Sequence, residues 1–307
     1  MRGIVRAIAI AGLAGAALFV SASVAHAPAP SAPSASPDAT ASPPAAADGG
    51  AFPLPLQTAQ RTLQDPAISE LSGLAASQLH PGVVYGINDS GGQAVVFAID
   101  SAGNTVARLR LAQFEARDWE AIAPGRDDDG RPVLWIGDIG DNLSNQKRVR
   151  VIRIAEPAAL VDQDVDWQAF AITYPDGPHN AETLVVHPAD GALSVITKGD
   201  AEPGAMYRLP QPLRRDGVNT ATRVGDVPPG ITDGAYELSQ PQAPRLVLTD
   251  YWQLHRLGET GWVSALGPLQ LQREALAWPW LPEGQPNDLV LVGAEGTGST
   301  IKTATVP

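Results

Sequence analysis

The sequence contains no cysteine among its 307 residues. It therefore has no disulfide, thiolate nucleophile, cysteine-ligated zinc site or iron–sulfur cluster, and no lipid attached to a cysteine. Basic residues are also scarce, 21 against 33 acidic residues, and the net charge of −12 argues against a nucleic-acid-binding protein. Only 18% of residues are charged and 44% are hydrophobic, so we expect most of the chain to fold around a core.

The N-terminus has the pattern of a secretory signal peptide over residues 1–27. Two arginines, Arg2 and Arg6, precede an uncharged apolar run over residues 7–20, and Ala25-His26-Ala27 forms an A-x-A cleavage site. The alternative is an uncleaved membrane anchor, but the run is shorter than the roughly 20 residues of a span. We therefore expect a secreted, extracellular protein, cleaved near Ala27, with no stable membrane insertion afterwards. Cleavage removes two arginines and brings the net charge to −14.

Residues 28–52 are expected to form a disordered linker. Proline, alanine and serine fill 18 of the 23 positions from 28 to 50. Such a segment cannot bury enough apolar surface to offset the entropy lost on ordering. The folded domain is therefore expected over residues 53–307.

Residues 53–307 have few long helical patterns and many short β-rich runs. Examples are Val83–Ile87, Val133–Ile136, Leu193–Thr197 and Leu289–Val292, separated by Gly, Pro, Asn and Asp. No window of 12 or more residues keeps a clean 3.6-residue period. Short strands at regular spacing with turn residues between them predict an all-β sandwich, barrel or propeller.

An internal repeat favours the propeller. An acidic residue followed by small and apolar residues returns five times, at intervals of 41 to 62 residues: Glu70, Glu120, Glu182, Asp233 and Glu274. After each acid a second apolar strand ends in a polar turn, and third and fourth strands follow. Four strands in each repeat are typical of a propeller blade.

The spacing predicts five blades. After Glu274 only enough chain remains for the second and third strands of a last blade. The segment Leu54–Leu63, before the first repeat, is therefore expected to supply the outer strand of that blade and to close the ring, which removes an exposed sheet edge. Six blades remain the alternative, because a weak repeat is easily missed.

The repeat acids are expected to meet at one mouth of the central channel. Each precedes or begins a first strand, and the turn after each second strand lies on the same face because adjacent strands are antiparallel. These turns place further candidate ligand-binding and metal-binding residues around the mouth: Asp89, Asp138, Asp141, Lys198, Asp250 and Glu295.

Three roles for the acids remain open. Each could accept hydrogen bonds from backbone amides of the neighbouring blade, which needs no metal. They could instead bind a cation, and oxygen-only ligands favour Ca²⁺ over zinc. The candidate metal ligands are then Glu70, Glu120, Asp138, Asp141, Glu182, Asp233 and Glu274. In a third role, Glu120, Glu182 and the nearby His179 are the candidates for catalysis.

Two aromatic residues could line the same mouth. Trp119 adjoins Glu120 and Trp252 lies in a second turn, where each could stack on a sugar or another flat ligand. Packing between blades is the more frequent use of tryptophan. The chain has no G-x-S-x-G and no H-E-x-x-H, so neither a nucleophile-elbow esterase nor a zinc peptidase is indicated.

The motifs of the first three repeats resemble those of a known family. They are Glu70–Leu74, Ile87–Gly91, Asp118-Trp119-Glu120, Gly137–Asn142 and Asn180-Ala181-Glu182. This combination resembles a mostly uncharacterised family of secreted bacterial β-propellers, abundant in actinobacteria and loosely similar to phytase-like and esterase-like propellers. The resemblance implies secretion and a propeller, but no particular activity. Phytase-like propellers hold calcium and carry basic residues for phosphate, whereas Lys198 is the only lysine expected at this mouth.

The leading hypothesis is a secreted binding or scaffold protein whose acidic mouth binds Ca²⁺. Its partner would be a small molecule or an extracellular or cell-surface component, not nucleic acid, and we expect a monomer. The alternative is a metal-dependent hydrolase of phosphoesters, esters or lactones that uses the same mouth. A third hypothesis is a purely structural repeat protein.

Overall fold

The structure is a computed structural model that describes residues 60–89, 93–268, 270, 272–279 and 288–307. Of the two units into which the chain divides, residues 1–53 and 54–307, only the second contains described residues. The expected signal peptide and linker lie outside the described residues, so both remain predictions. In the described part of the chain, no helix is long and apolar enough to cross a membrane.

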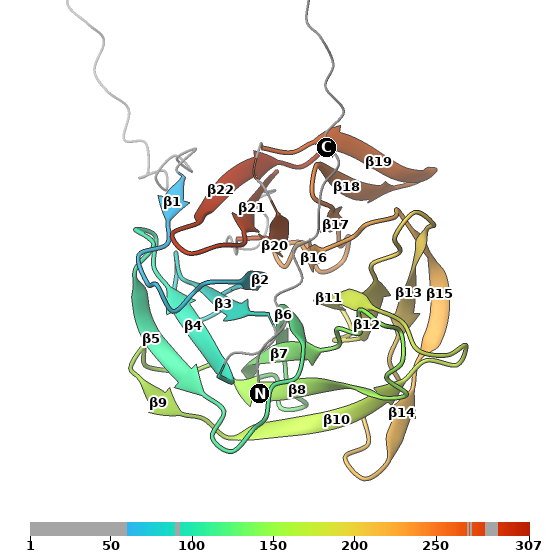
Figure 1. Ribbon diagram of the computed structural model, residues 1–307, viewed down its shortest axis with the longest axis horizontal. Coiled ribbons are helices and arrows are strands. Elements are labelled where there is room, and N and C mark those ends of the chain that lie inside the picture. The colour runs from blue at the N-terminus through green and yellow to red at the C-terminus, as the bar shows by residue number, and fades with distance from the viewer. Residues whose placement is uncertain (1–59, 90–92, 269, 271, 280–287) are drawn as a thin grey trace, which may run out of the picture. The chain divides into compact units, whose positions relative to one another are not determined.

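The described residues of the second unit form strands and no helix, as the sequence predicted. Five separate sheets surround a centre, so the ring is a five-bladed β-propeller (Figure 1). From the inside outwards, blade 1 consists of β2 (Leu71–Ala76), β3 (Val84–Asn88), β4 (Val95–Ile99), β5 (Thr105–Arg110) and β9 (Gln163–Asp164). Blade 2 consists of β6 (Trp119–Arg126), β7 (Pro132–Asp138), β8 (Val149–Ala155), β10 (Trp167–Thr173) and β14 (Val218–Thr220).

The other three blades have four strands each. Blade 3 consists of β11 (Ala181–Val186), β12 (Leu193–Thr197), β13 (Gly204–Arg208) and β15 (Thr222–Val227). Blade 4 consists of β16 (Asp233–Tyr236), β17 (Leu246–Thr249), β18 (Gln253–Gly258) and β19 (Gly261–Leu266). Blade 5 consists of β20 (Arg273–Ala277), β21 (Leu289–Ala294), β22 (Thr300–Thr305) and β1 (Arg61–Thr62).

The ring closes between the two ends of the domain. Strand β1 pairs antiparallel with β22, with Arg61 opposite Ile301 and Thr62 opposite Thr300. The N-terminal segment therefore supplies the outer strand of the last blade, as the strand count predicted. The earlier part of that expected strand, residues 54–59, lies outside the described residues.

Two outer strands were not predicted. Strand β9 pairs in parallel with β5, and β14 pairs in parallel with β10, so blades 1 and 2 each have a fifth strand. Beside β9, the carboxylate of Asp162 accepts a hydrogen bond from the Arg108 amide at 2.8 Å. Within it, Asp164 forms an ion pair with Arg110 at 2.8 Å. Such short strands depend on a tertiary neighbour, which a single-sequence pattern does not reveal.

The centre of the ring is packed with small and apolar side chains. Every residue of β2 and β11 is buried. The space between the innermost strands β2, β6, β11, β16 and β20 holds a cavity of about 10 Å³, the room for one water molecule at most. The innermost strands therefore leave little free space toward their C-terminal ends.

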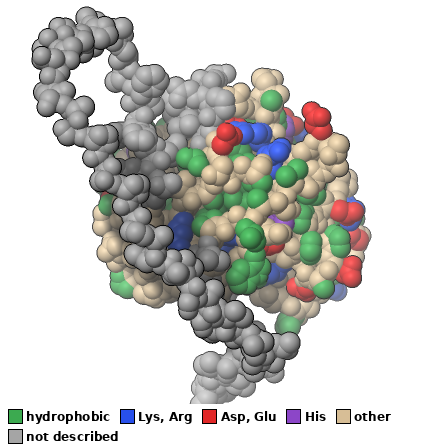
Figure 2. Space-filling model, turned by 90° about the horizontal axis from the view of Figure 1, so that it is seen from above, with side chains coloured by type: hydrophobic (Ala, Val, Ile, Leu, Met, Phe, Trp, Pro, Cys, Tyr) green, Lys and Arg blue, Asp and Glu red, His purple; other side chains and the backbone are tan. Residues whose placement is uncertain are grey.

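Apolar clusters between neighbouring blades hold the ring together. Trp135 and Phe170 of blade 2 share a cluster with Leu184 and Tyr207 of blade 3. On the side of the molecule in Figure 2, hydrophobic side chains are scattered among polar ones and several acidic side chains lie along the right-hand edge. Acidic residues are thus present both on the outside of the ring and at the site described next.

Candidate functional site

The repeat acids lie where the first strands begin, on one face of the ring. Glu70 directly precedes β2, Asp233 begins β16, and each of the remaining three is the second residue of its strand: Glu120 in β6, Glu182 in β11 and Glu274 in β20. Because the second strands run in the opposite direction, their C-terminal turns end on the same face. We call this face the acidic mouth.

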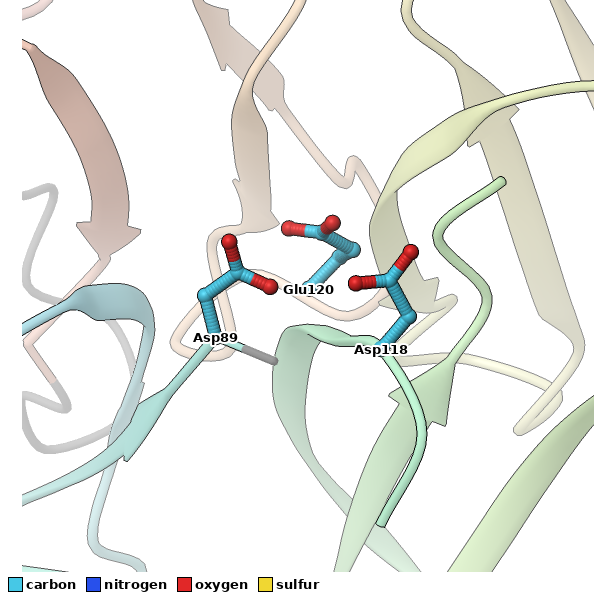
Figure 3. Close-up of side chains that lie close together, drawn as sticks. All are labelled: Asp89, Asp118 and Glu120. Carbon is cyan, nitrogen blue, oxygen red and sulfur yellow. The ribbon is translucent and has the colours of Figure 1, made fainter. Parts of the chain in front are cut away.

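Three carboxylates of blades 1 and 2 meet there. One oxygen each from Asp89, Asp118 and Glu120 lies within 4.8 Å of the other two, and we call these residues the carboxylate cluster. Figure 3 shows the three carboxylates facing one another, Asp89 from the turn after β3 and the other two from the start of β6. Glu120 is buried, whereas the other two are partly exposed. Solvent therefore reaches the cluster at Asp89 and Asp118.

Neighbouring groups fix the cluster in place. The Ser72 hydroxyl, on β2, donates a hydrogen bond to Glu120 Oε2 at 2.8 Å. Asp138 Oδ1 accepts the amide of Asp118 at 2.8 Å. Gly140 passes so close that a Cβ there would lie 2.5 Å from Glu120 Oε1 and in contact with the Asp118 carboxylate. A side chain at position 140 would therefore push the two carboxylates out of their present positions.

Burial and the close approach of like charges raise the pKa values of two carboxyl groups in the cluster, those of Asp118 and Glu120. Burial and the charge of Asp89 raise the pKa of Asp118 to about 7. Burial and the charges of Glu182 and Asp89 raise the pKa of Glu120 well above its usual value. Such shifts indicate carboxylates that lack enough positive charge nearby, which a bound cation would supply.

A second group of residues lies at the same mouth, in blades 3, 4 and 5. Lys198 Nζ donates to Glu182 Oε1 at 3.1 Å and to the Tyr251 hydroxyl at 3.2 Å. The Tyr251 hydroxyl donates in turn to Glu274 Oε1 at 3.1 Å. We call Glu182, Lys198, Tyr251 and Glu274 the lysine network.

Three members of the lysine network have pKa values above their usual ones. Burial and the nearby Glu295 raise the pKa of Glu274 to about 7. Burial alone would lower the pKa of Lys198, but the charges of Glu182 and Tyr251 raise it above its usual value. Burial raises the pKa of Glu182, although Lys198 opposes the shift. Since the charge of Glu182 also acts on Asp118 and Glu120, the network and the cluster form one electrostatic unit.

Other predicted metal ligands have partners within the protein. Asp233 is fully buried and accepts the amides of Gly234 and of Leu276 in the next blade. Asp138 forms an ion pair with Arg150, with 2.7 Å between Nε and Oδ2. Asp141 accepts the Gln146 amide at 2.7 Å. For Asp233 this is the blade-to-blade capping expected of a structural acid.

The remaining predicted mouth residues are less central. Glu70 is exposed, although its charge acts on Glu295. Asp250 accepts the amides of Trp252 and Gln253 in its own turn and contacts His255 Nε2 at 3.2 Å. The exposed Trp252 offers a flat surface beside this turn.

Trp119 and His179, both predicted at the mouth, have their contacts with residues outside the carboxylate cluster and the lysine network. Trp119 is 1% exposed and packs in the apolar cluster between blades 1 and 2, with its ring 6.0 Å from that of Phe114. It is therefore a packing residue. His179 Nε2 contacts Asp176 Oδ1 and the Tyr207 hydroxyl, each at 3.0 Å. These contacts orient His179 toward β13 and its neighbours.

The sequence interpretation did not include Asp118 and Tyr251 among the site residues. A signal for Asp118 was present, because this acid directly precedes β6 and lies two residues before the candidate Glu120. Tyr251 follows Asp250 in a predicted mouth turn, but its bond to Glu274 crosses between blades. A contact of that kind depends on the assembled ring.

Comparisons with known proteins give no family for this chain. No protein-family model matches, and no curated protein sequence matches. Solved structures with similarity include a gluconolactonase from Xanthomonas campestris, with 12% identity, a TM-score of 0.41, and 78% of this chain and 87% of the other covered. A soluble aldose sugar dehydrogenase from Escherichia coli has 12% identity, a TM-score of 0.42, and 81% and 99% coverage.

A glucose dehydrogenase structure is similar to the same extent, with 11% identity, a TM-score of 0.45, and 81% and 99% of the two chains covered. Because the identities and TM-scores are this low, the activities of these proteins indicate nothing about the activity of this chain. The five-bladed propeller rests on the sheets of this chain itself. Membership of the secreted actinobacterial family remains an expectation from the sequence.

Proposed function

We propose that this protein is a secreted binding protein that holds Ca²⁺ at the acidic mouth and uses it to bind an oxygen-rich ligand. The observation that carries the proposal is the meeting of three carboxylates, from Asp89, Asp118 and Glu120, within 4.8 Å of one another. The ligand is a small molecule or an extracellular or cell-surface component. Secretion is supported by the signal-peptide pattern of residues 1–27.

The donor set fits calcium better than other common metals. The cluster offers carboxylate oxygens and contains no histidine, and the chain has no cysteine. Ca²⁺ takes six to eight oxygen ligands in flexible geometry, whereas zinc prefers nitrogen and sulfur. Three carboxylates supply fewer than eight ligands, so positions remain for water and for the oxygens of a bound ligand.

Direct calcium binding tests the proposal. We expect isothermal titration of the mature protein, freed of metal with a chelator, to show one strong Ca²⁺ site and a rise in melting temperature on binding. The Glu120→Gln variant should bind Ca²⁺ at least about ten-fold more weakly, because it removes the buried charge of the cluster. Glu259→Gln, an exposed residue between β18 and β19, is the matched control.

Two results would reject the metal proposal. One is the absence of calcium binding and of any stabilisation in the wild-type protein. The other is equal calcium affinity in Glu120→Gln, Glu259→Gln and the wild type, which would place the ion elsewhere. In either case the acids would be left with the structural role that Asp233 has.

The lysine network favours a second candidate function, a metal-dependent hydrolase of phosphoesters, esters or lactones. Glu274, with a pKa raised to about 7, contacts Tyr251, which contacts Lys198. A carboxyl group with a pKa near neutrality is suited to general acid–base catalysis. A cation beside it would polarise a carbonyl or phosphoryl oxygen.

A substrate panel separates the two functions. Hydrolysis of aryl phosphates, aryl esters and sugar lactones should be followed with added Ca²⁺ in the wild type, Glu274→Gln and Glu259→Gln. A hydrolase would lose most of its turnover in Glu274→Gln at saturating Ca²⁺, whereas its calcium affinity would fall only severalfold, because Glu274 is not part of the carboxylate cluster. Equal, background rates in all three proteins would leave the binding function alone.

A further inference from the structure

A second concave site lies on the face of the ring opposite the acidic mouth. It is a cavity of about 700 Å³ between blades 2 and 3, a size typical of small-molecule sites. It lies where β6 and β11 end and where the hairpins after them turn back, at Arg126–Asp128 and His187–Gly191. The acidic mouth lies at the other end of these two strands. The cavity shares no lining residue with the carboxylate cluster or the lysine network.

Aromatic and aliphatic side chains form the floor of this cavity. The rings of Trp135 on β7 and Phe170 on β10 lie 5.8 Å apart, and Val186 and Leu193 form the wall from blade 3. Gly125 on β6 makes room for the indole, because a Cβ there would lie 2.9 Å from Trp135 Cδ1. The floor would therefore contact the apolar body of a ligand.

Arg153 lies over this floor, where residues of the two neighbouring strands, β7 and β10, hold its side chain. Arg153 on β8 is the cross-strand neighbour of both Trp135 and Gln168. Its guanidinium carbon lies 5.6 Å from the centre of the Trp135 ring, and its Nη2 donates to Gln168 Oε1 at 2.7 Å. A stacked guanidinium held at one nitrogen keeps further N–H donors in a fixed plane, which suits a carboxylate.

Among the described residues, the aspartates of the lining and its arginines differ in their direct partners. Asp190 is already paired with Arg208 at 2.7 Å, and Asp127 accepts two amides of its own turn and lies 3.8 Å from Arg131. In contrast, the lining arginines Arg126 and Arg153 donate to neutral oxygens. The lining also includes Arg215 and the exposed Asp128, for which the described residues supply no ion-pair partner. The lining thus holds three arginines and three aspartates, and among these arginines Arg153 is the one stacked on the apolar floor.

We infer that this cavity binds a small organic carboxylate with an aromatic or apolar body, whose carboxylate pairs with Arg153 while its body lies on the Trp135–Phe170 floor. A single half-buried guanidinium matches one negative charge. The exposed arginines at the rim, Arg126 and Arg215, contribute attraction at longer range. We name the cavity the arginine pocket.

Titration with probes of matched shape tests the inference. Phenylacetate and indole-3-acetate are compared with their neutral amides, and with phenyl phosphate, by isothermal titration and ligand-observed NMR on the mature protein. We expect saturable binding of the carboxylates, with the amides about ten-fold weaker or more, because they lose the charge-assisted hydrogen bonds. Binding should be the same in the wild type and in Glu120→Gln, since the two sites are separate.

Variants assign the binding to the arginine pocket. Arg153→Gln should lose about ten-fold or more in carboxylate affinity, whereas Arg110→Gln, at an exposed arginine of blade 1 outside the lining, should keep the wild-type value. If Arg153→Gln does not fold, Ala189→Trp serves instead, because position 189 is an exposed lining residue of a loop and a large side chain there would fill the cavity.

Three outcomes would overturn the inference. They are no saturable binding of any carboxylate, equal affinity for carboxylates and amides, and unchanged binding in both Arg153→Gln and Ala189→Trp. Tighter binding of phenyl phosphate than of the carboxylates would likewise reject a carboxylate as the ligand class. None of these results affects calcium binding at the acidic mouth, so the two proposals fail separately.

Discussion

The buried carboxylate of Asp233 accepts a hydrogen bond from the Leu276 amide at 2.6 Å, and this bond joins blade 4 to blade 5. Asp233 Oδ1 also accepts the Gly234 amide at 2.8 Å, and the residue is 0% exposed. Burial raises the pKa of Asp233, although the amides oppose the shift. A repeat acid has thus become a structural element of the ring.

We expect Asp233→Ala to destabilise the fold without removing calcium. The substitution leaves two buried amides without their acceptor, at a cost of about 1–3 kcal/mol each. Chemical denaturation should show the loss in the free energy of unfolding, and calcium titration should give the wild-type stoichiometry. Asp128→Ala, an exposed hairpin residue, is the control. Loss of calcium with unchanged stability would instead make Asp233 a metal ligand.

Gly140→Ala should disturb the carboxylate cluster selectively. A Cβ at this position would lie 2.5 Å from Glu120 Oε1, so the carboxylates would have to move apart. Groups that orient metal ligands typically change metal affinity about 10–100-fold when altered, and we expect a calcium affinity lower by that amount. In Gly225→Ala no atom lies within 4 Å of the new Cβ, so this variant should bind calcium normally. Equal affinities in both variants would contradict this view of the cluster.

The metal-free protein should become less stable as the pH rises from about 4 to about 8. The pKa of Asp118 is raised to about 7 in the folded state from 3.8, so the folded state binds more protons than the unfolded state within this interval. The contribution of such a group to stability is present below the unfolded pKa and is lost as the pH rises through the folded pKa. Calcium competes with these protons and should stabilise the protein more at pH 8 than at pH 5.

Thermal melts in chelator and in calcium at pH 5 and pH 8 measure both trends. In Asp118→Asn the metal-free protein should lose part of its pH dependence, whereas Asp128→Asn should retain it. If calcium stabilised the wild type equally at both pH values, protonation of the cluster would not be linked to metal binding.

Lys198→Gln should increase calcium affinity severalfold. Lys198 compensates the charge of Glu182, which acts on both Asp118 and Glu120. Removing the ammonium group makes the potential at the mouth more negative, and the increase should shrink with added salt. Lys147→Gln, an exposed lysine, is the control for the change in net charge. A weaker calcium site in Lys198→Gln alone would show that the lysine network positions the ligands.

The secondary structure and the order of strands followed from the sequence to a large extent. The repeated acid, the alternating apolar runs and the chain length gave five blades and an outer strand from the N-terminus, and the pairing of β1 with β22 agrees. The two parallel edge strands, β9 and β14, are only two and three residues long and lie outside the four-strand repeat, so the repeat did not indicate them.

The sequence by itself determined that acids gather on one face. Each lies at the start of the first strand of a repeat, and because the same blade is repeated around the ring, all these positions lie on the same face. Only the tertiary structure decided what each acid does, because equivalent positions in different blades have different neighbours. Glu120 meets Asp89 and Asp118, Glu182 meets Lys198, and Asp233 meets backbone amides. The arginine pocket likewise exists only in the folded ring, since Arg153, Trp135 and the wall of blade 3 come together through strand pairing and the packing of two blades.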